Sequence, residues 1–300
     1  MRQGTGIPIL PTLLLVLLQT ACFHATDPDQ DGEKAVASGL ADADLDRHLV
    51  QLKTQVPAKG FTIVVQRPFV VIGDEPAASV HLRAKKTVKW AVERLKTKFF
   101  EKDPDRIFDI WLFKDDESYR KHTREIFGHE PDTPFGYSSP EQGALIMNIG
   151  TSGGTLIHEI VHPFVAANFP GCPAWFNEGL GSLYEQCCEK DGEIRGLTNW
   201  RLAGLQAAIS AGNLPSFREL TGTTTQEFYD EDPGTNYAQA RYLCYYLQEK
   251  ELLPLYYRAF RANREKDPTG FETLEKVLDL EDGDAFRETW EEYVLELSFP

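Results

Sequence analysis

The sequence predicts an α+β fold, in which a small mixed sheet with helices precedes a mainly helical C-terminal half. Short β-branched runs bounded by turn residues occupy the first half of the chain. From Thr151 onward, apolar residues recur at helical spacing instead. The 300 residues, 42% of them apolar and 26% charged, are enough to bury a substantial core.

The first half alternates between the two kinds of element. Strands are expected where β-branched and aromatic residues cluster, and helices where apolar residues return every three or four positions. In order, we expect strands over 61–65 and 69–73, a helix over 77–100, a strand over 107–113, a helix over 115–127 and a buried strand over 144–150.

The second half reads almost entirely as helix. We expect helices over 151–168, 174–186, 199–211, 235–249, 251–263, 270–279 and 284–296. One sheet packed on this helical body, or two sub-domains with a cleft between them, fits the order equally well.

The N-terminus resembles an export signal. Residues 7–18 form a short apolar run behind Arg2, as in the core of a secretory signal. The run ends in LLQTAC, which resembles the lipobox of bacterial lipoproteins, with Cys22 as the lipidated residue and Gln19 as a departure from the pattern. We therefore expect a signal peptide over 1–21 and an extracytoplasmic protein held at the cell envelope through Cys22. Ordinary signal cleavage nearby is the alternative.

Residues 22–58 are expected to form a tether and a short amphipathic helix that carries Leu45, Leu49 and Leu52. A single domain over 59–300 follows. The formal net charge of −15 argues against a nucleic-acid partner, which needs a basic face.

Four cysteines remain once Cys22 is processed, and an even number in an exported chain makes disulfides plausible. A straight helix over 174–186 would separate Cys172 from Cys187 and Cys188 by far more than a disulfide spans. We expect neither of those bridges, and Cys244 is the better candidate for pairing. A thiolate zinc site is a weak alternative, because no CxxC spacing occurs.

The segment His158-Glu159-Ile160-Val161-His162 is an HExxH motif. Histidines four residues apart lie on one face of a helix, so both imidazoles can bind one ion, and Glu159 can reach a metal-activated water without being a ligand. Pro163 removes one helical hydrogen bond just past the second histidine. The alternative is a helix whose two histidines are merely solvated.

A catalytic zinc ion needs a third protein ligand. No histidine follows His162, so this ligand is a carboxylate or comes from upstream. Glu178 lies sixteen residues past His162, among Trp, Phe, Leu and Gly, where a carboxylate is costly to bury without a cation or a hydrogen-bond partner. Glycines after Glu178 allow its helix to approach the HExxH helix closely. The alternative is that Glu178 is exposed on the surface.

HEIVH followed by WFNEGLGSLYE resembles the gluzincin-type zinc metallopeptidases, and the wider pattern is similar to the peptidase-MA-like family of bacterial extracytoplasmic proteins of the DUF1570 type. The wider similarity includes Gly136-Tyr137 before the HExxH helix and NYAQARYLCYYL in the helical tail. The resemblance implies a zincin-like helical half, with Zn²⁺ held by His158, His162 and Glu178. It also implies Glu159 as the general base. Pro163 and a ligand spacing shorter than in thermolysin-like enzymes are departures.

The function that we expect is zinc-dependent hydrolysis of a peptide or protein substrate. Glu159 would take a proton from the attacking water and deliver it to the leaving amine. Tyr237 and Tyr137 are candidates for the donor that stabilises the oxyanion. Glu185 is a candidate to orient a ligand histidine, and a solvated helix face is the alternative for it.

Two other functions stay open at this point. One is a catalytically inactive peptidase fold that presents its cleft to a protein partner, and the other is a protein with a purely architectural zinc. Four protein ligands and no need for Glu159 would distinguish the architectural site.

Overall fold

The computed structural model describes residues 41–57, 59–151, 153–230, 235–280 and 283–299. The chain divides into Met1–Val36 and Ala37–Pro300, and every described residue belongs to the second unit. The expected signal segment over 1–21 and Cys22 lie outside the described residues. Across the described ranges, no helix has both the length and the apolar character needed to cross a membrane.

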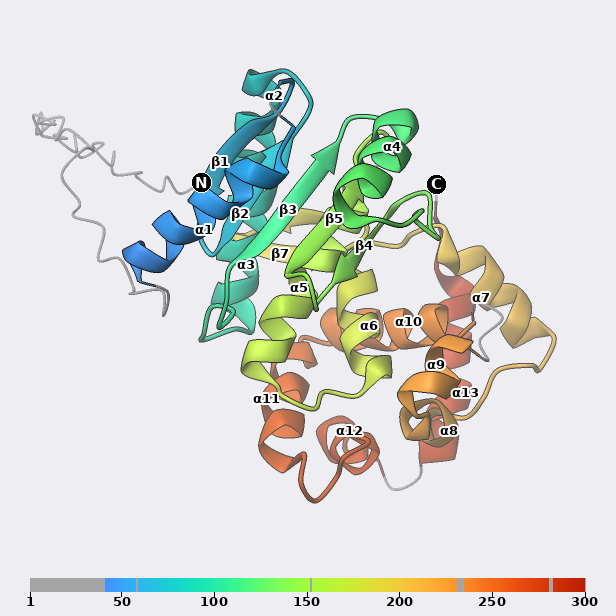
Figure 1. Cartoon of the computed structure of the whole chain (residues 1–300). Helices are drawn as coiled ribbons and strands as arrows, with labels where there is room; N and C mark the ends of the chain where they lie inside the picture. The colour runs from blue at the N-terminus through green and yellow to red at the C-terminus, as the bar shows by residue number, and fades with distance from the viewer. Residues whose placement is uncertain (1–40, 58, 152, 231–234, 281–282, 300) are drawn as a thin grey trace, which may run out of the picture. The chain divides into compact units, whose positions relative to one another are not determined.

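A five-stranded sheet lies in the first half of the chain, in the order β1-β2-β3-β5-β4 (Figure 1). Its central strands β2, β3 and β5 are parallel, and the two edge strands β1 and β4 run antiparallel to their neighbours. The mixed sheet confirms the predicted α+β class. The strands are β1 (Thr62–Gln66), β2 (Phe69–Gly73), β3 (Phe108–Phe113), β4 (Gly136–Ser139) and β5 (Ala144–Asn148).

The helices predicted in the first half are present. The long helix expected over 77–100 contains one π-helical stretch, η1, between two α-helical parts. Strand β4 was not predicted, because four residues of sequence GYSS carry no apolar alternation. The helical elements here are α1 (Asp42–Gln55), α2 (Ala77–Arg83), η1 (Ala84–Lys89), α3 (Trp90–Lys98) and α4 (Asp116–Phe127).

All seven helices predicted in the second half are also present, as α5 (Gly154–Asn168), α6 (Ala174–Leu183), α7 (Arg201–Ser210), α10 (Thr235–Glu249), α11 (Leu253–Asn263), α12 (Phe271–Leu278) and α13 (Gly283–Glu296). The helix expected to reach residue 186 ends at Leu183, because the chain turns into a hairpin of β6 (Cys187–Lys190) and β7 (Glu193–Gly196). Two further helices, α8 (Phe217–Gly222) and α9 (Thr225–Asp230), are too short to show a helical period in sequence.

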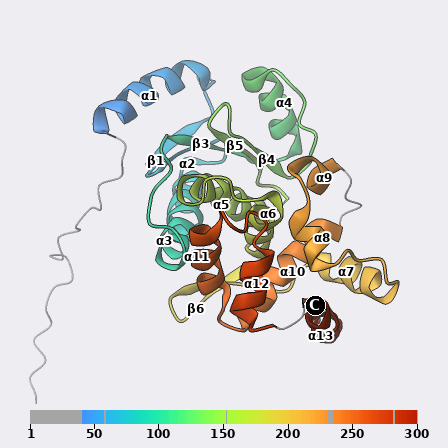
Figure 2. The same ribbon diagram turned by 90° about the horizontal axis from the view of Figure 1, so that it is seen from below.

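The two faces of the sheet bury different clusters. Helices α1 and α4 cover one face, and α5 lies on the other (Figure 2). The face toward α1 buries Trp111 and Ile146 together with Leu52 of α1, so the predicted short helix packs on the sheet. The face toward α5 buries Leu112 and Met147 in a core that continues into the helical body. Successive side chains of each strand point to opposite faces of the sheet, so alternate residues face α5 and the residues between them face α1 and α4.

The four cysteines Cys172, Cys187, Cys188 and Cys244 are free thiols. The prediction that Cys172 bridges neither Cys187 nor Cys188 is confirmed. The expectation that Cys244 pairs is wrong: it is buried where α10 crosses α6, so close that a Cβ on Gly179 would lie 3.1 Å from its sulfur. A buried thiol in such a contact serves as a small apolar side chain.

Candidate metal centre

Helices α5 and α6 approach each other closely because glycines stand at their contact. A Cβ on Gly181 of α6 would lie 3.2 Å from the imidazole of His158 on α5. At the start of α5, a Cβ on Gly154 would overlap the backbone carbonyl of Glu185. Helix α5 runs through Pro163 to Asn168, so the proline does not end it. The close approach predicted from the glycines after Glu178 is therefore present.

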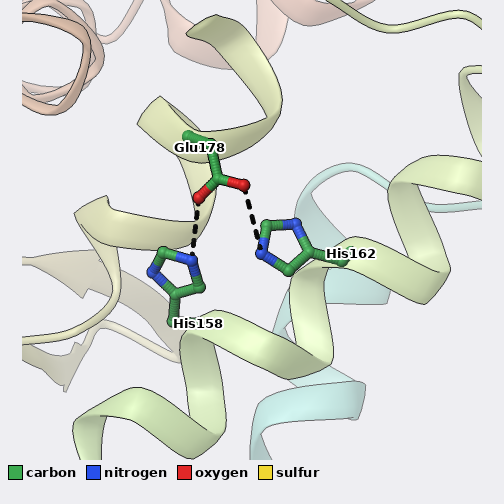
Figure 3. Close-up of side chains that lie close together, drawn as sticks. All are labelled: His158, His162 and Glu178. Atoms are coloured by element: carbon green, nitrogen blue, oxygen red, sulfur yellow. Dashed lines mark hydrogen bonds and ion pairs between the residues drawn. The ribbon is translucent and has the colours of Figure 1, made fainter. Parts of the chain in front are cut away.

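His158, His162 and Glu178 converge between these two helices. Glu178 points from α6 toward both imidazoles of α5 (Figure 3). Its Oε2 atom lies 3.1 Å from Nε2 of His158, and its Oε1 atom lies 3.8 Å from Nε2 of His162. Among the described residues these three form the group whose donor atoms suit a metal ion, all within 4.8 Å of one another. The group contains no cysteine, so the thiolate alternative has no counterpart here.

The spacing of the donor atoms fits a small tetrahedral ion. Ligand bonds of about 2.0 Å at tetrahedral angles place neighbouring donor atoms about 3.3 Å apart. The separations of 3.1 and 3.8 Å from the Glu178 oxygens bracket that value. Two imidazoles and one carboxylate are also a ligand set of catalytic zinc sites, which keep a further position open. These three residues can therefore hold a divalent metal ion.

Both histidines face a polar group on the far side of the ring, through a hydrogen bond at His162 and through a longer ion-pair contact without hydrogen-bond geometry at His158. Nδ1 of His162 lies 3.0 Å from Oδ1 of Asn177, and because an amide oxygen can only accept, this nitrogen carries the proton. Nδ1 of His158 lies 3.4 Å from Oε1 of Glu185. In each ring the Nε2 atom is left to face Glu178. Outer partners of this kind fix the tautomer and the direction of metal-binding histidines.

Glu185 is itself held by Arg201. The guanidinium of Arg201 donates from Nε and Nη2 to the two Glu185 oxygens, at 3.0 and 2.8 Å. Glu185 is therefore a buried group that links α7 to His158, rather than part of a solvated helix face. Glu185 is a residue predicted from the sequence, whereas Arg201, sixteen residues away in a separate helix, was not predicted.

Tyr229 reaches the same centre from α9. Its hydroxyl donates to Oε1 of Glu178 at 2.6 Å. Tyr229 was not predicted from the sequence, because 51 positions separate it from Glu178 and nothing in the intervening pattern links the two residues. Each oxygen of Glu178 thus faces one imidazole, and Oε1 also accepts a hydrogen bond from the Tyr229 hydroxyl.

Electrostatics favours an ionised carboxylate at Glu178. Burial alone would raise its pKa, but His162, His158 and the Tyr229 hydroxyl together lower that pKa to about 2. Burial likewise opposes ionisation of Glu185, and His158 with Arg201 lowers its pKa to about 2. Burial would lower the pKa of His158, yet the facing carboxylates raise it well above its ordinary value. Two buried carboxylates therefore supply negative charge where a cation would bind.

Glu159 lines a cavity beside the centre, with a volume of about 580 Å³. Its Oε2 atom lies 3.9 Å from Nε2 of His162, near the donor atoms but outside the group that they form. His158, Glu185 and Arg201 line the same cavity. A water molecule in this space can approach Glu159 and the metal position together.

The two tyrosines named from sequence are on different sides of the sheet. Tyr237 lines the cavity, with the Arg201 guanidinium over its ring, and burial raises its pKa, so its hydroxyl keeps its proton. Tyr137 does not reach the cavity. It pairs with Ile146 in the register of β4 and β5, which turns its side chain to the α1 face, and its hydroxyl contacts His129 at 2.7 Å. The candidacy of Tyr137 as an oxyanion donor is therefore withdrawn.

No family model matches this chain, and a search of curated proteins found no similar relative.

Proposed function

We propose that the protein is a zinc-dependent peptidase in which Glu159 is the general base. The observation that carries the proposal is the meeting of His158, His162 and Glu178 beside a cavity that Glu159 lines. The residues fit zinc in donor type and in spacing. This is also the site that the gluzincin resemblance implies.

The remaining residues have roles that follow from their positions. A bound zinc ion would supply a Lewis acid that polarises the scissile carbonyl and promotes ionisation of water. Glu159 would accept the proton of the attacking water and pass it to the leaving amine. Tyr237 would donate a hydrogen bond to the developing oxyanion from the cavity wall. Asn177 and Glu185 would keep the two imidazoles directed at the ion.

Strand β4 supports a peptide substrate. It is an edge strand, and its first residue, Gly136, lines the cavity together with Phe135 just before it. An extended peptide can pair with such an edge through its backbone and would then run along the cavity whatever its side chains are.

The test compares Glu159→Gln with the unaltered chain. Glutamine keeps the size of the side chain but cannot accept the proton, so hydrolysis of a fluorogenic peptide library should fall by about 100- to 10,000-fold. Zinc content, measured on the same samples, should not change, because Glu159 is not a ligand. Glu117→Gln, on an exposed residue of α4, is the matched control and should retain full activity.

Two results would contradict the proposal. Full activity in Glu159→Gln would exclude this residue as the base. Zinc bound without any hydrolysis by the unaltered chain would favour the alternative function, an inactive peptidase fold that binds a protein partner in its cleft.

We also propose that the protein is exported and attached to the cell envelope through a lipid on Cys22. The support is the apolar run over 7–18, the TAC that ends it, and the acidic segment that follows. Mass spectrometry of the mature protein should find an N-terminal modified Cys22, and Cys22→Ser should abolish the modification. An unmodified N-terminus downstream of Cys22 in both proteins would show ordinary secretion instead.

A further inference from the structure

Two exposed aromatic side chains line the cavity beside the metal centre. Phe135 is 52% exposed and Trp200 is 51% exposed. Other large apolar side chains are exposed in the described part of the chain, but none of them lines this cavity. Aromatic rings that remain exposed to water in a concave site gain free energy when an apolar ligand covers them. Such rings are therefore common contacts for apolar ligands.

Trp200 stands on a rigid support. The preceding residue, Asn199, is fully buried, and its side-chain amide donates to Glu185 at 3.0 Å. Its backbone N–H donates to the hydroxyl of Tyr242 at 3.0 Å. The following residue, Arg201, is held by two bonds to Glu185. Both neighbours of Trp200 are thus tied to the carboxylate that contacts His158, so the backbone that carries the indole is anchored to the residues around the metal centre.

Phe135 is supported in a similar way from the sheet. Asn148, at the end of β5, is only 2% exposed. Its backbone N–H donates to the carbonyl of Phe135 at 2.9 Å, and its side-chain amide donates to the carbonyl of Pro134 at 2.9 Å. The ring of Phe135 therefore projects from a fixed backbone rather than from a loose loop.

The charges around the cavity disfavour an acidic group there. Arg201 is the arginine of the lining, and its guanidinium is already paired with Glu185. Glu159 adds a carboxylate to the same wall. A carboxylate of the substrate would meet no uncompensated side-chain cation among the described residues of the lining, whereas an apolar side chain would cover the two exposed rings.

We propose that the cavity selects peptides with a bulky apolar side chain, above all an aromatic one, next to the cleaved bond, and that Phe135 and Trp200 contact this side chain. The proposal rests on the proposed function and names its substrate class. The volume of about 580 Å³ is within the range of sites that enclose a ligand group of this size.

The experiment separates recognition from hydrolysis. Acetylated and amidated pentapeptides, alanine throughout except for a central Phe, Leu, Ala or Asp, are titrated by calorimetry into zinc-loaded Glu159→Gln protein. The Phe peptide should bind most tightly and the Asp peptide least. Trp200→Ala and Phe135→Ala, each added to that background, should each weaken binding of the Phe peptide by about three- to ten-fold and leave the Ala peptide unchanged. Trp200→Phe should restore most of the loss.

The matched control is Phe299→Ala, which removes an aromatic ring that is 42% exposed outside the cavity. It should leave every affinity unchanged. In the active protein, the kcat/KM ratio between the Phe and Ala peptides should fall by the same factor in Trp200→Ala.

Equal affinity for the Phe and Ala peptides, or an unchanged preference in both cavity variants, would overturn the proposal. Absence of hydrolysis by the unaltered chain would instead contradict the proposed function, because the binding measurement does not depend on turnover.

Discussion

A histidine–carboxylate pair lies on each side of the five-stranded sheet, and the two pairs differ in what surrounds them. On the α1 side, Nε2 of His48 lies 2.7 Å from Oδ1 of Asp109, a residue of β3 that is 8% exposed. On the α5 side, Nε2 of His158 lies 3.1 Å from Oε2 of Glu178. Residue types and distances are similar, yet only the second pair belongs to a group that suits a metal ion in the described ranges.

The surroundings decide what each pair can do. Burial is the largest influence on Asp109 and raises its pKa, although His48 opposes the shift. At Glu178 burial also acts to raise the pKa, but two imidazoles and a tyrosine outweigh it. The isolated His48–Asp109 pair joins α1 to the sheet. At Glu178, two imidazoles and a tyrosine hydroxyl together keep the buried carboxylate ionised and able to bind a cation.

The largest expected effect is loss of the metal in Glu178→Ala. Removing a ligand should weaken zinc binding by well over the roughly 100-fold that loss of an outer partner costs. Asp109→Asn, on the other side of the sheet, should leave zinc affinity unchanged. Competition with a chromogenic chelator measures both. Full zinc affinity in Glu178→Ala would place the third ligand elsewhere, and Glu185 would be the next residue to change.

A smaller effect is expected for Tyr229→Phe. The variant removes the hydrogen bond to Oε1 of Glu178 while keeping the ring, so zinc affinity should fall by about ten-fold. Tyr137→Phe removes a hydroxyl on the opposite face and should have no effect on zinc. The same chelator competition applies to both. If the two variants lose zinc equally, the contact of Tyr229 with Glu178 does not orient the ligand.

The smallest expected effect is on the acid sensitivity of the metal-free protein. The folded-state pKa of Glu185 is lowered to about 2, so its stabilising contribution is present above its ordinary value of 4.5 and is lost as the pH falls toward about 2. The pKa of Asp109 is raised, so its protonation on acidification relieves a cost instead. Glu185→Gln should therefore reduce the slope of unfolding free energy against pH, by at most about 1.4 kcal/mol per pH unit.

Asp109→Asn should not reduce that slope. Urea denaturation of the metal-free variants at neutral pH and between about pH 4.5 and 3 measures the difference. An equal reduction in both variants would mean that acid sensitivity does not come from the α5 side.

The sequence alone predicted the longer elements and the three residues of the candidate metal centre. His158 and His162 share a helix face because helical geometry is local, and the absence of later histidines directed attention to Glu178. Short β-branched and apolar runs predicted all three buried parallel strands. Short elements were missed: β4, the β6–β7 hairpin, α8 and α9 are too brief to show a period.

Only the tertiary structure decided which distant side chains hold the carboxylates beside the two histidines: Tyr229 contacts Glu178, and Arg201 contacts Glu185. Tyr229 and Arg201 come from separate helices, and the register of β4 against β5 sends Gly136 to the cavity and Tyr137 to the opposite face. A shift of one residue in that register would reverse the two. Periodicity along the chain reports which side of an element is buried, whereas contacts between elements depend on how helices and strands pack in space.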